Sequence, residues 1–208
     1  MKIYDISVNI NENMTVYKNR DEKRPKIINR ANYNTHDLYE SSITLDLHTG
    51  THIDAPLHMI EDGNVINDYP LSSFITEAKV IDLTSLQDKI TKEDLEKHVI
   101  NAGDFILLKT RNSFYEGFDF EFVYLDRDGA QYLQDKKIKG VGIDALGIER
   151  DQKDRLTHIR LLSAGIIIIE GLNLKEVNAG TYKLIALPLK IDGVEASPTR
   201  AVLIESKS

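Results

Sequence analysis

Asp46-Leu47-His48-Thr49-Gly50-Thr51-His52-Ile53-Asp54-Ala55-Pro56-Leu57-His58 is the stretch around which the rest of this chain is organised. It holds three of the six histidines of the chain, together with one aspartate that lies among them. Neutral imidazole and carboxylate groups are the usual protein ligands of zinc, manganese and iron. Gly50, Thr51 and Pro56 disfavour a helix, so the stretch differs from the helical zinc motif in which two histidines share one helix face.

The spacing around the motif predicts a strand, a turn and a second extended segment. Apolar and polar residues alternate from Ile43 to His48, which is the period-2 pattern of a half-buried strand. We expect this strand to deliver His48, a tight turn to follow at Thr49-Gly50, and an extended segment to return His52 and Asp54. These three side chains then gather around one ion. His58 stands near the ion without needing to bind it.

The histidines also have a simpler interpretation. A lone histidine beside an apolar strand is most often a hydrogen-bonded structural residue. Three histidines and an aspartate at this spacing around a glycine turn favour a metal site instead. A purely structural metal site fits less well, because structural zinc favours cysteine-rich ligand sets and this chain has no cysteine.

The composition restricts the class of protein. At 208 residues, the chain has the length of one domain, which we expect to span 1–208. A net charge of −7 argues against a nucleic-acid partner, because phosphate binding needs a concentrated basic surface. No apolar run approaches the ~20 residues of a membrane helix, and the N-terminus does not resemble a signal peptide. We therefore expect a cytoplasmic protein with no nucleic-acid partner and no membrane partner.

Local patterns along the chain predict an α/β fold with a mixed sheet. Strand patterns cover residues 2–10, 43–47, 79–83, 104–110, 140–144, 166–172, 183–191 and 201–205. Helical patterns begin at Thr91 and cover residues 126–137 and 155–164. Residues 11–34 are polar and are expected to form a largely irregular loop that helps to cover the site, and residues 192–198 are expected to form a turn.

Two residues in the second half of the chain add to the candidate site. His158 lies beside the apolar face of the helix predicted before Gly165. Glu170 ends the very apolar strand pattern that follows. A buried carboxylate is costly unless it is paired or bound to a metal. The alternative is a glutamate that emerges into solvent where its strand ends.

The pattern His48-x-Gly50-Thr51-His52-x-Asp54-x-Pro56-x-His58 resembles the signature of the cyclase family of metal-dependent hydrolases, which includes bacterial kynurenine formamidase and isatin hydrolase. The resemblance extends over most of the chain. Its further matches are Asp5-Ile6-Ser7, Gly103-Asp104-Phe105, Gly142-Ile143-Asp144, His158, Glu170-Gly171-Leu172, and Gly193 with Ser197-Pro198-x-Arg200-Ala201. It implies a swivelling β/β/α single domain that assembles into homodimers or homotetramers.

The resemblance also implies roles for single residues. By similarity, His48, His52 and Asp54 would bind a first metal ion. His158 would bind a second ion, with Asp54 and Glu170 bridging the two. His58 would be the catalytic acid/base. The cofactor would be a divalent metal, with zinc expected first and manganese as the alternative, at one or two ions per chain.

One segment departs from the family pattern. The formamidases carry a Met-Pro-x-Trp-Pro-Gly-Asp-like segment whose tryptophan stacks on the aromatic substrate. The matching segment here is Met14-Thr15-Val16-Tyr17-Lys18-Asn19-Arg20, and the chain has no tryptophan. Tyr17 is the candidate replacement for this substrate-binding ring. The natural substrate is therefore left open.

The implied chemistry is hydrolysis of a carbon–nitrogen bond in a small linear or cyclic amide, as in an arylformamidase. A bound divalent ion would supply an activated water, and His58 would move its proton to the departing nitrogen. Two alternatives remain at this point. One is an ester or lactone hydrolase that uses the same site, and the other is a non-catalytic protein that binds a metal or a ligand.

Overall fold

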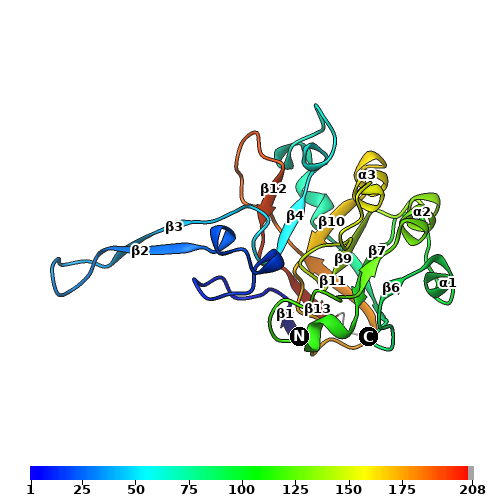
Figure 1. Ribbon diagram of the computed structural model, residues 1–208, viewed down its shortest axis with the longest axis horizontal. Helices are drawn as coiled ribbons and strands as arrows, with labels where there is room; N and C mark the ends of the chain where they lie inside the picture. Colours follow the sequence, from blue (N-terminus) through cyan, green and yellow to red (C-terminus); the bar gives the residue numbers. More distant parts are fainter. Residues whose placement is uncertain (206–208) are drawn as a thin grey trace.

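The sheet at the centre of the molecule has nine strands in the order β1-β13-β11-β5-β7-β9-β10-β4-β12. The computed structural model, shown in Figure 1, describes residues 1–205. The strands are β1 (Ile3–Asp5), β4 (His52–Asp54), β5 (Ile75–Asp82), β7 (Phe105–Lys109), β9 (Gly140–Ile143), β10 (Ile167–Glu170), β11 (Gly180–Ile185), β12 (Ala196–Pro198) and β13 (Val202–Glu205). The pairings from β5 through β7 and β9 to β10 are parallel, and the others are antiparallel. The predicted α/β fold with a mixed sheet is confirmed.

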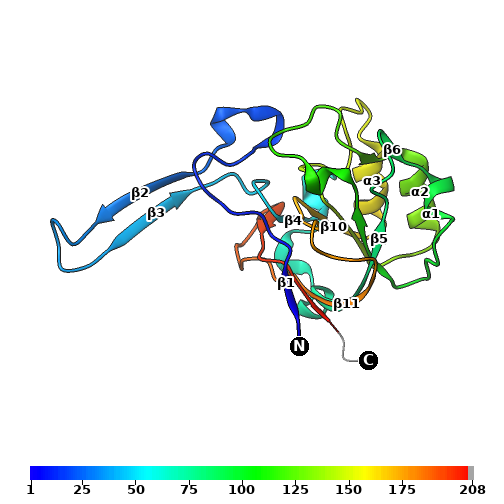
Figure 2. The same ribbon diagram turned by 90° about the horizontal axis from the view of Figure 1, so that it is seen from below.

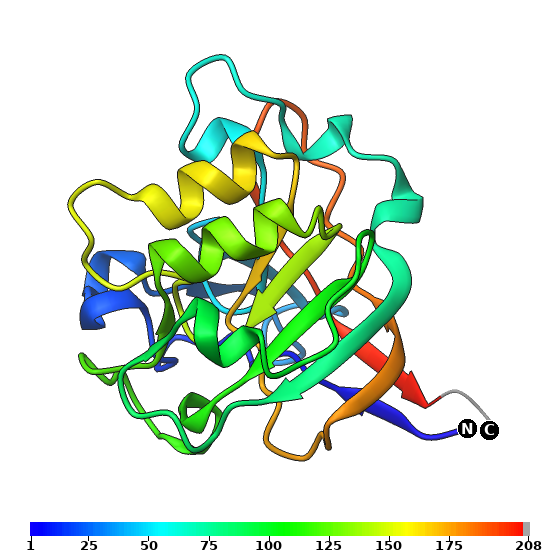
Figure 3. The ribbon, with the colours of Figure 1, turned by 90° about the vertical axis from the view of Figure 1, so that its right-hand side faces the viewer.

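Three helices lie together over one face of this sheet, as Figure 3 shows. They are α1 (Lys92–Leu95), α2 (Arg127–Asp135) and α3 (Leu156–Ser163). Polar side chains cap the N-termini of α1 and α2. At α1, the Thr91 and Asp94 side chains form a reciprocal capping box. At α2, Asp126 accepts hydrogen bonds from two backbone N–H groups of the helix. No helix in residues 1–205 is long and apolar enough to cross a membrane.

The period-2 alternation of the central strands gives the molecule two apolar cores, one on each face of the sheet. In β7, Ile106 and Leu108 join the core beneath the helices, whereas Phe105 and Leu107 join the core on the opposite face. In β10, Ile168 faces the helices in the same way. Because residues two apart share a face, Glu170 is also directed toward the helical side. This alternation determines where the polar site forms.

The smaller strands form two separate ladders, and the short turns complete the chain. The strands are β2 (Lys26–Ala31) with β3 (Glu40–Thr44), and β6 (Lys89–Ile90) with β8 (Tyr124–Leu125). The 3-10 turns are η1 (Tyr17–Asn19), η2 (Asp21–Lys23), η3 (Pro56–His58), η4 (Ile66–Asp68), η5 (Leu71–Ser73) and η6 (Arg111–Phe114). The β2–β3 hairpin projects from the body as a long arm (Figures 1 and 2).

This arm corrects two expectations from the sequence. Residues 26–31 are a strand and not part of an irregular loop. The strand before the histidine motif ends at Thr44, so His48 lies in a turn and not at a strand end. The side chain of Asp46 explains the early ending, because its Oδ1 accepts a hydrogen bond from the backbone N–H of His48 at 2.9 Å. Such a local bond offers the backbone an alternative to the sheet.

Other boundaries also differ from the predicted ones. The first strand ends at Asp5, α1 has only four residues, and Pro188 lies beyond the end of β11. The expected turn at residues 192–198 contains β12, which pairs with β4. Its residues bear no strand pattern of their own, so this strand exists because β4 provides a partner.

Candidate metal centre

The pairing of β4 with β10 brings the first site residues together. In this antiparallel ladder His52 lies opposite Glu170, and Asp54 lies opposite Ile168. Directly opposite residues share a face of the sheet, and so do residues two apart on one strand. His52, Asp54 and Glu170 therefore all lie on the face that α3 covers. His158 reaches the same place from the first turns of α3.

Two glycines let the turn that carries His48 approach the end of β10. Gly50 has a φ of +70° and Gly171 a φ of +67°, which is the left-handed region that favours glycine. A Cβ on Gly171 would overlap the carbonyl oxygen of Gly50. Beside this contact, the Thr51 hydroxyl donates a hydrogen bond to the carbonyl of Gly171 at 2.6 Å. The histidine turn is thus held against the strand that ends in Glu170.

Asp54 is the centre of the cluster and is fully buried. Its Oδ1 lies 3.0 Å from Nδ1 of His48 and 3.5 Å from Nε2 of His52. Its Oδ2 lies 3.8 Å from Nε2 of His158. The two carboxylate oxygens therefore face different imidazoles.

Glu170 makes a second link between the same groups. Its Oε2 lies 3.4 Å from Nε2 of His52, and its Oε1 lies 3.2 Å from Nε2 of His158. The backbone N–H of Ile148 donates to Oε1 at 2.5 Å. Because Glu170 is only 4% exposed, the alternative in which it emerges into solvent is wrong.

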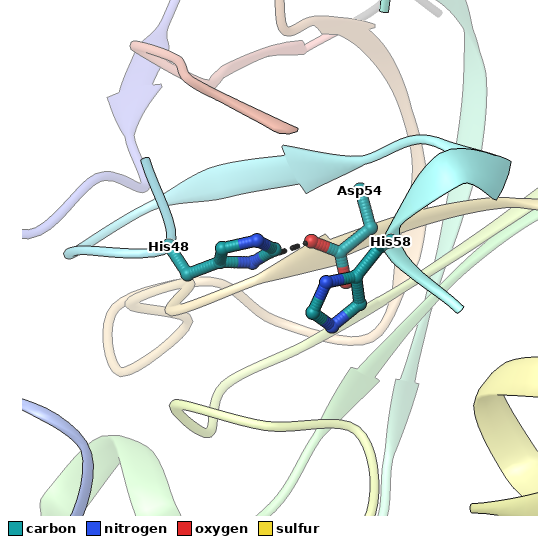
Figure 4. A group of neighbouring side chains, drawn as sticks. All are labelled: His48, Asp54 and His58. Atoms are coloured by element: carbon teal, nitrogen blue, oxygen red, sulfur yellow. Dashed lines mark ion pairs between the residues drawn. The ribbon is translucent and has the colours of Figure 1, made fainter. Parts of the chain in front are cut away.

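His58 completes the cluster from the η3 turn after β4. Its ring centroid lies 4.1 Å from that of His48 and 5.6 Å from that of His158. Figure 4 shows one oxygen of the Asp54 carboxylate directed at the His48 ring, with the His58 ring beside the carboxylate. His48, Asp54 and His58 can bring donor atoms within 4.8 Å of one another, as can His52, Asp54 and Glu170. His58 is thus close enough to bind an ion itself, which the sequence did not require.

The donor atoms of this cluster fit a divalent cation. Both oxygens of Asp54 and Nε2 of His52 are buried without a hydrogen bond, which is costly for polar atoms. Two ligand atoms at ~2.1 Å from one ion, at angles of about 90–110°, lie about 3.0–3.4 Å apart. The separations of 3.0, 3.5, 3.4 and 3.2 Å between neighbouring donors in the cluster agree with this spacing.

Opposite charges control the protonation of the buried groups. Burial alone would lower the pKa of His52, but the carboxylates of Glu170 and Asp54 raise it to about 9. Burial also opposes charge on His158, whose pKa is raised to about 10 by Glu149 and Glu170. Burial and the charge of Glu170 would raise the pKa of Asp54, yet its imidazole neighbours hold that pKa below the usual value. Positive charge is therefore favoured at this site.

His58 differs from these groups. Burial is the main cause that lowers its pKa to about 4. The carboxylate of Asp54 opposes this shift, and the neighbouring His48 and His158 add to it. At neutral pH His58 is therefore uncharged and able to accept a proton.

Tyr17 lies in the η1 turn and does not join the ligand cluster. Its ring packs edge-to-face against Phe118, with 5.3 Å between the ring centroids. A Cβ on Gly147, in the loop after β9, would lie 3.4 Å from the Tyr17 ring. The role of Tyr17 in substrate binding stays a prediction.

Two carboxylates at the site were missed by the sequence reasoning. Oε1 of Glu149 lies 2.9 Å from Nδ1 of His158, and Oε1 of Glu195 lies 3.4 Å from Nε2 of His48. Both residues lie in polar loops, where a glutamate is normally solvated. The sequence identifies them only by their positions, because each lies in a loop next to a helix or strand that carries or supports the site.

A separate cavity of about 330 Å³ lies between the N-terminal segment and the loops after β7 and β9. Its walls include Val8, Asn112, Asp144 and Leu172, but none of the predicted site residues. The Asp144 carboxylate accepts hydrogen bonds from backbone and hydroxyl groups of Thr110 and Ser113. Its bonds thus hold the turn that follows β7.

Comparison with known proteins gives consistent matches. The family model described as "Putative cyclase" matches residues 4–150. A kynurenine formamidase from Salinibacter ruber is 34% identical over 206 residues, which cover 98% of this chain and 97% of the relative. A solved structure described as a potential metal-dependent hydrolase with cyclase activity is 49% identical, with a TM-score of 0.92 over 100% of this chain and 99% of that one.

A more distant solved structure has the same fold. Isatin hydrolase A from Labrenzia aggregata, bound to benzyl benzoate, is 23% identical to this chain. The TM-score is 0.84, and the match covers 97% of this chain and 93% of that one. At this identity the likeness concerns the fold alone.

Proposed function

The chain belongs to the cyclase family, and from this premise we propose that it is a metal-dependent hydrolase that cleaves the carbon–nitrogen bond of a small amide. The similarity to kynurenine formamidase covers nearly the whole chain, which supports amide hydrolysis. The observation that carries the proposal is Asp54, a fully buried carboxylate with no hydrogen bond, surrounded by imidazole nitrogens.

The residues of the cluster suggest how the reaction proceeds. His48, His52, Asp54, His158 and Glu170 would hold the cation. A divalent ion held there would lower the pKa of a bound water toward ~7 and would polarise the substrate carbonyl. A ring nitrogen of neutral His58 accepts the proton of the attacking water. The same nitrogen then returns this proton to the departing amine, so that the amide and one water give a carboxylic acid and an amine.

We propose zinc as the natural ion, with manganese as the alternative, because both suit a set of imidazole and carboxylate ligands. Two ions per chain are supported by the two oxygens of Asp54, which face different imidazoles. Glu170 supports the same proposal, since its two oxygens face His52 and His158.

We further propose that the enzyme works as a homodimer or homotetramer. The β2–β3 arm supports this, because Ile27 and Ile43 form a cross-strand pair and are 41% and 52% exposed. An isolated two-stranded hairpin is at best marginally stable in water, so the arm benefits from a second surface. Light scattering should give a mass above the 23.6 kDa of one chain. An Ile27→Ser/Ile43→Ser variant should shift the protein toward the monomer, and a monomeric wild type would contradict this assembly.

The substrate and the location remain proposals. Tyr17 is the candidate ring for an aromatic substrate, and its replacement of a tryptophan leaves the choice of amide open. A small-molecule substrate, the lack of a nucleic-acid or membrane partner and a cytoplasmic location are predictions from the sequence.

The function is tested by metal content and a substrate panel. Protein purified without chelators is analysed for metal and then incubated with aryl formamides, cyclic amides and matched esters. We expect one or two equivalents of a divalent metal and turnover of amides that a chelator abolishes. Turnover of esters or lactones alone would favour the alternative hydrolase. A protein that cannot be loaded with metal would refute the proposed function.

A further inference from the structure

Two of the predicted ligand histidines, His52 and His158, have an oxygen atom close to the ring nitrogen that points away from the cluster. Nδ1 of His52 lies 3.0 Å from the carbonyl oxygen of Gly50. Nδ1 of His158 lies 2.9 Å from Oε1 of Glu149. A histidine that binds a metal through one nitrogen commonly donates its other N–H to such an acceptor.

The Glu149 side chain is buried and is held in place by a hydrogen bond of its own. The residue is only 7% exposed, although it lies in the loop between β9 and α3. Its second oxygen, Oε2, accepts a hydrogen bond from the backbone N–H of Thr157 at 3.1 Å. One carboxylate therefore holds both the start of α3 and the imidazole one residue further along.

The contact between Oε1 of Glu149 and Nδ1 of His158 is an ion-pair contact at 2.9 Å and falls outside hydrogen-bond geometry. The place of the proton follows from the chemistry of the two groups. An ionised carboxylate accepts hydrogen bonds only, so Nδ1 of His158 must carry the proton. In the neutral ring this leaves a lone pair on Nε2, the nitrogen that faces Glu170 and Asp54. A cation bound by the cluster needs that lone pair.

We propose that Glu149 is a positioning residue, which holds His158 in the tautomer that offers Nε2 to the metal. This inference rests on the proposed function, because Glu149 would orient a ligand of the proposed metal ion. Glu149 acts through His158 and need not touch the substrate.

Two substitutions separate this task from a merely structural one. In Glu149→Gln the amide oxygen can still accept from Thr157, while the amide NH₂ turns toward Nδ1 of His158. That change favours the tautomer with the proton on Nε2, which blocks the metal-binding lone pair. In Glu149→Ala the contact with Thr157 is lost, but His158 is free to adopt either tautomer. Both substitutions remove the same negative charge.

The two variants are therefore expected to rank in opposite order for cation affinity and for melting temperature. Cation affinity, measured by titrating the metal-free protein with zinc against a competing chelator, should fall about 10- to 100-fold in Glu149→Gln and less in Glu149→Ala. Melting temperature of the metal-free protein should fall more in Glu149→Ala than in Glu149→Gln. Glu93→Gln, which removes an exposed carboxylate at the start of α1, is the charge control and should match the wild type in both measurements.

The outcomes distinguish the positioning role of Glu149 from the proposed function of the protein. If the wild type binds zinc and Glu149→Gln binds it as tightly as Glu93→Gln does, the positioning role is refuted and the proposed function stands. If alanine weakens binding more than glutamine does, Glu149 is a structural residue only. If the wild type itself binds no divalent cation, the proposed function fails, and the role of Glu149 fails with it.

Discussion

Replacing Gly171 with alanine tests the close contact that holds the histidine turn against β10. The added Cβ would overlap the carbonyl oxygen of Gly50 and lie 2.7 Å from its carbonyl carbon. Both atoms belong to the backbone, so the strain cannot be relieved by rotating a side chain. The left-handed φ of +67° adds a cost of its own for a residue with a Cβ.

The size of the effect follows from these two contributions. Overpacking costs about 1–3 kcal/mol, and the left-handed conformation costs about 1–2 kcal/mol. The free energy of unfolding of Gly171→Ala should therefore fall by roughly 2–5 kcal/mol. In a protein of this size the melting temperature should fall by about 4–20 °C.

Gly165 provides the matched control. Its φ is +71°, but a Cβ added there would meet no atom within 4 Å. Gly165→Ala should lose only the conformational part, about 1–2 kcal/mol. The difference between the two variants, about 1–3 kcal/mol, measures the contact with Gly50.

Scanning calorimetry of both metal-free variants measures this difference, since a bound ion would itself raise the melting temperature. Gly171→Ala should also bind zinc more weakly than Gly165→Ala, because the displaced Gly50 carbonyl is the acceptor for Nδ1 of His52. Equal melting temperatures for the two variants would refute the argument that the backbone contact is tight.

Three further predictions concern the site itself. His58→Ala should keep its metal content but lose about 10²- to 10⁴-fold in kcat, measured with an amide that the wild type cleaves; unchanged turnover would refute the acid/base role. Asp54→Asn should lose bound metal in elemental analysis, because one buried carboxylate faces every imidazole of the predicted ligand set. At pH 7.5 the metal-free protein should hold protons on His52 and His158, whose pKa values are raised to about 9 and about 10. Zinc binding should therefore release about two protons from these rings, a number given by calorimetry in buffers of different ionisation enthalpy, and the release should vanish as the pH rises beyond about 10.

The sequence predicted the parts of the site that depend on local chemistry. The spacing of His48, His52 and Asp54 around a glycine carried enough information to expect a cluster, and the structure brings these residues together. The apolar run before Glu170 predicted its buried strand in the same way. Ligand chemistry and hydrophobic periodicity are properties of short segments, so they can be read without a fold.

Features that depend on distant partners were not accessible in this way. The segment that forms β12 contains Ser197 and Pro198 and resembles a turn, yet it is a strand because β4 pairs with it. Glu149 and Glu195 are ordinary loop residues until the fold places them beside His158 and His48. Conversely, the alternation of apolar and polar residues up to His48 predicted a longer strand. The strand ends early, because the backbone N–H of His48 donates a hydrogen bond to the side chain of Asp46.

The position of β4 has a consequence for the order in which the protein is made. This strand lies between β10 and β12, whose residues follow it far along the chain; the bond from Thr51 to Gly171, for example, spans 120 residues. Synthesis proceeds from the N-terminus, so the three histidines of residues 48–58 leave the ribosome long before Glu170 and His158 exist. A growing chain that has exposed only these histidines has metal-binding side chains but not yet the sheet that surrounds them. The complete set of predicted ligands can therefore form only at the end of folding, after the last strands have enclosed β4.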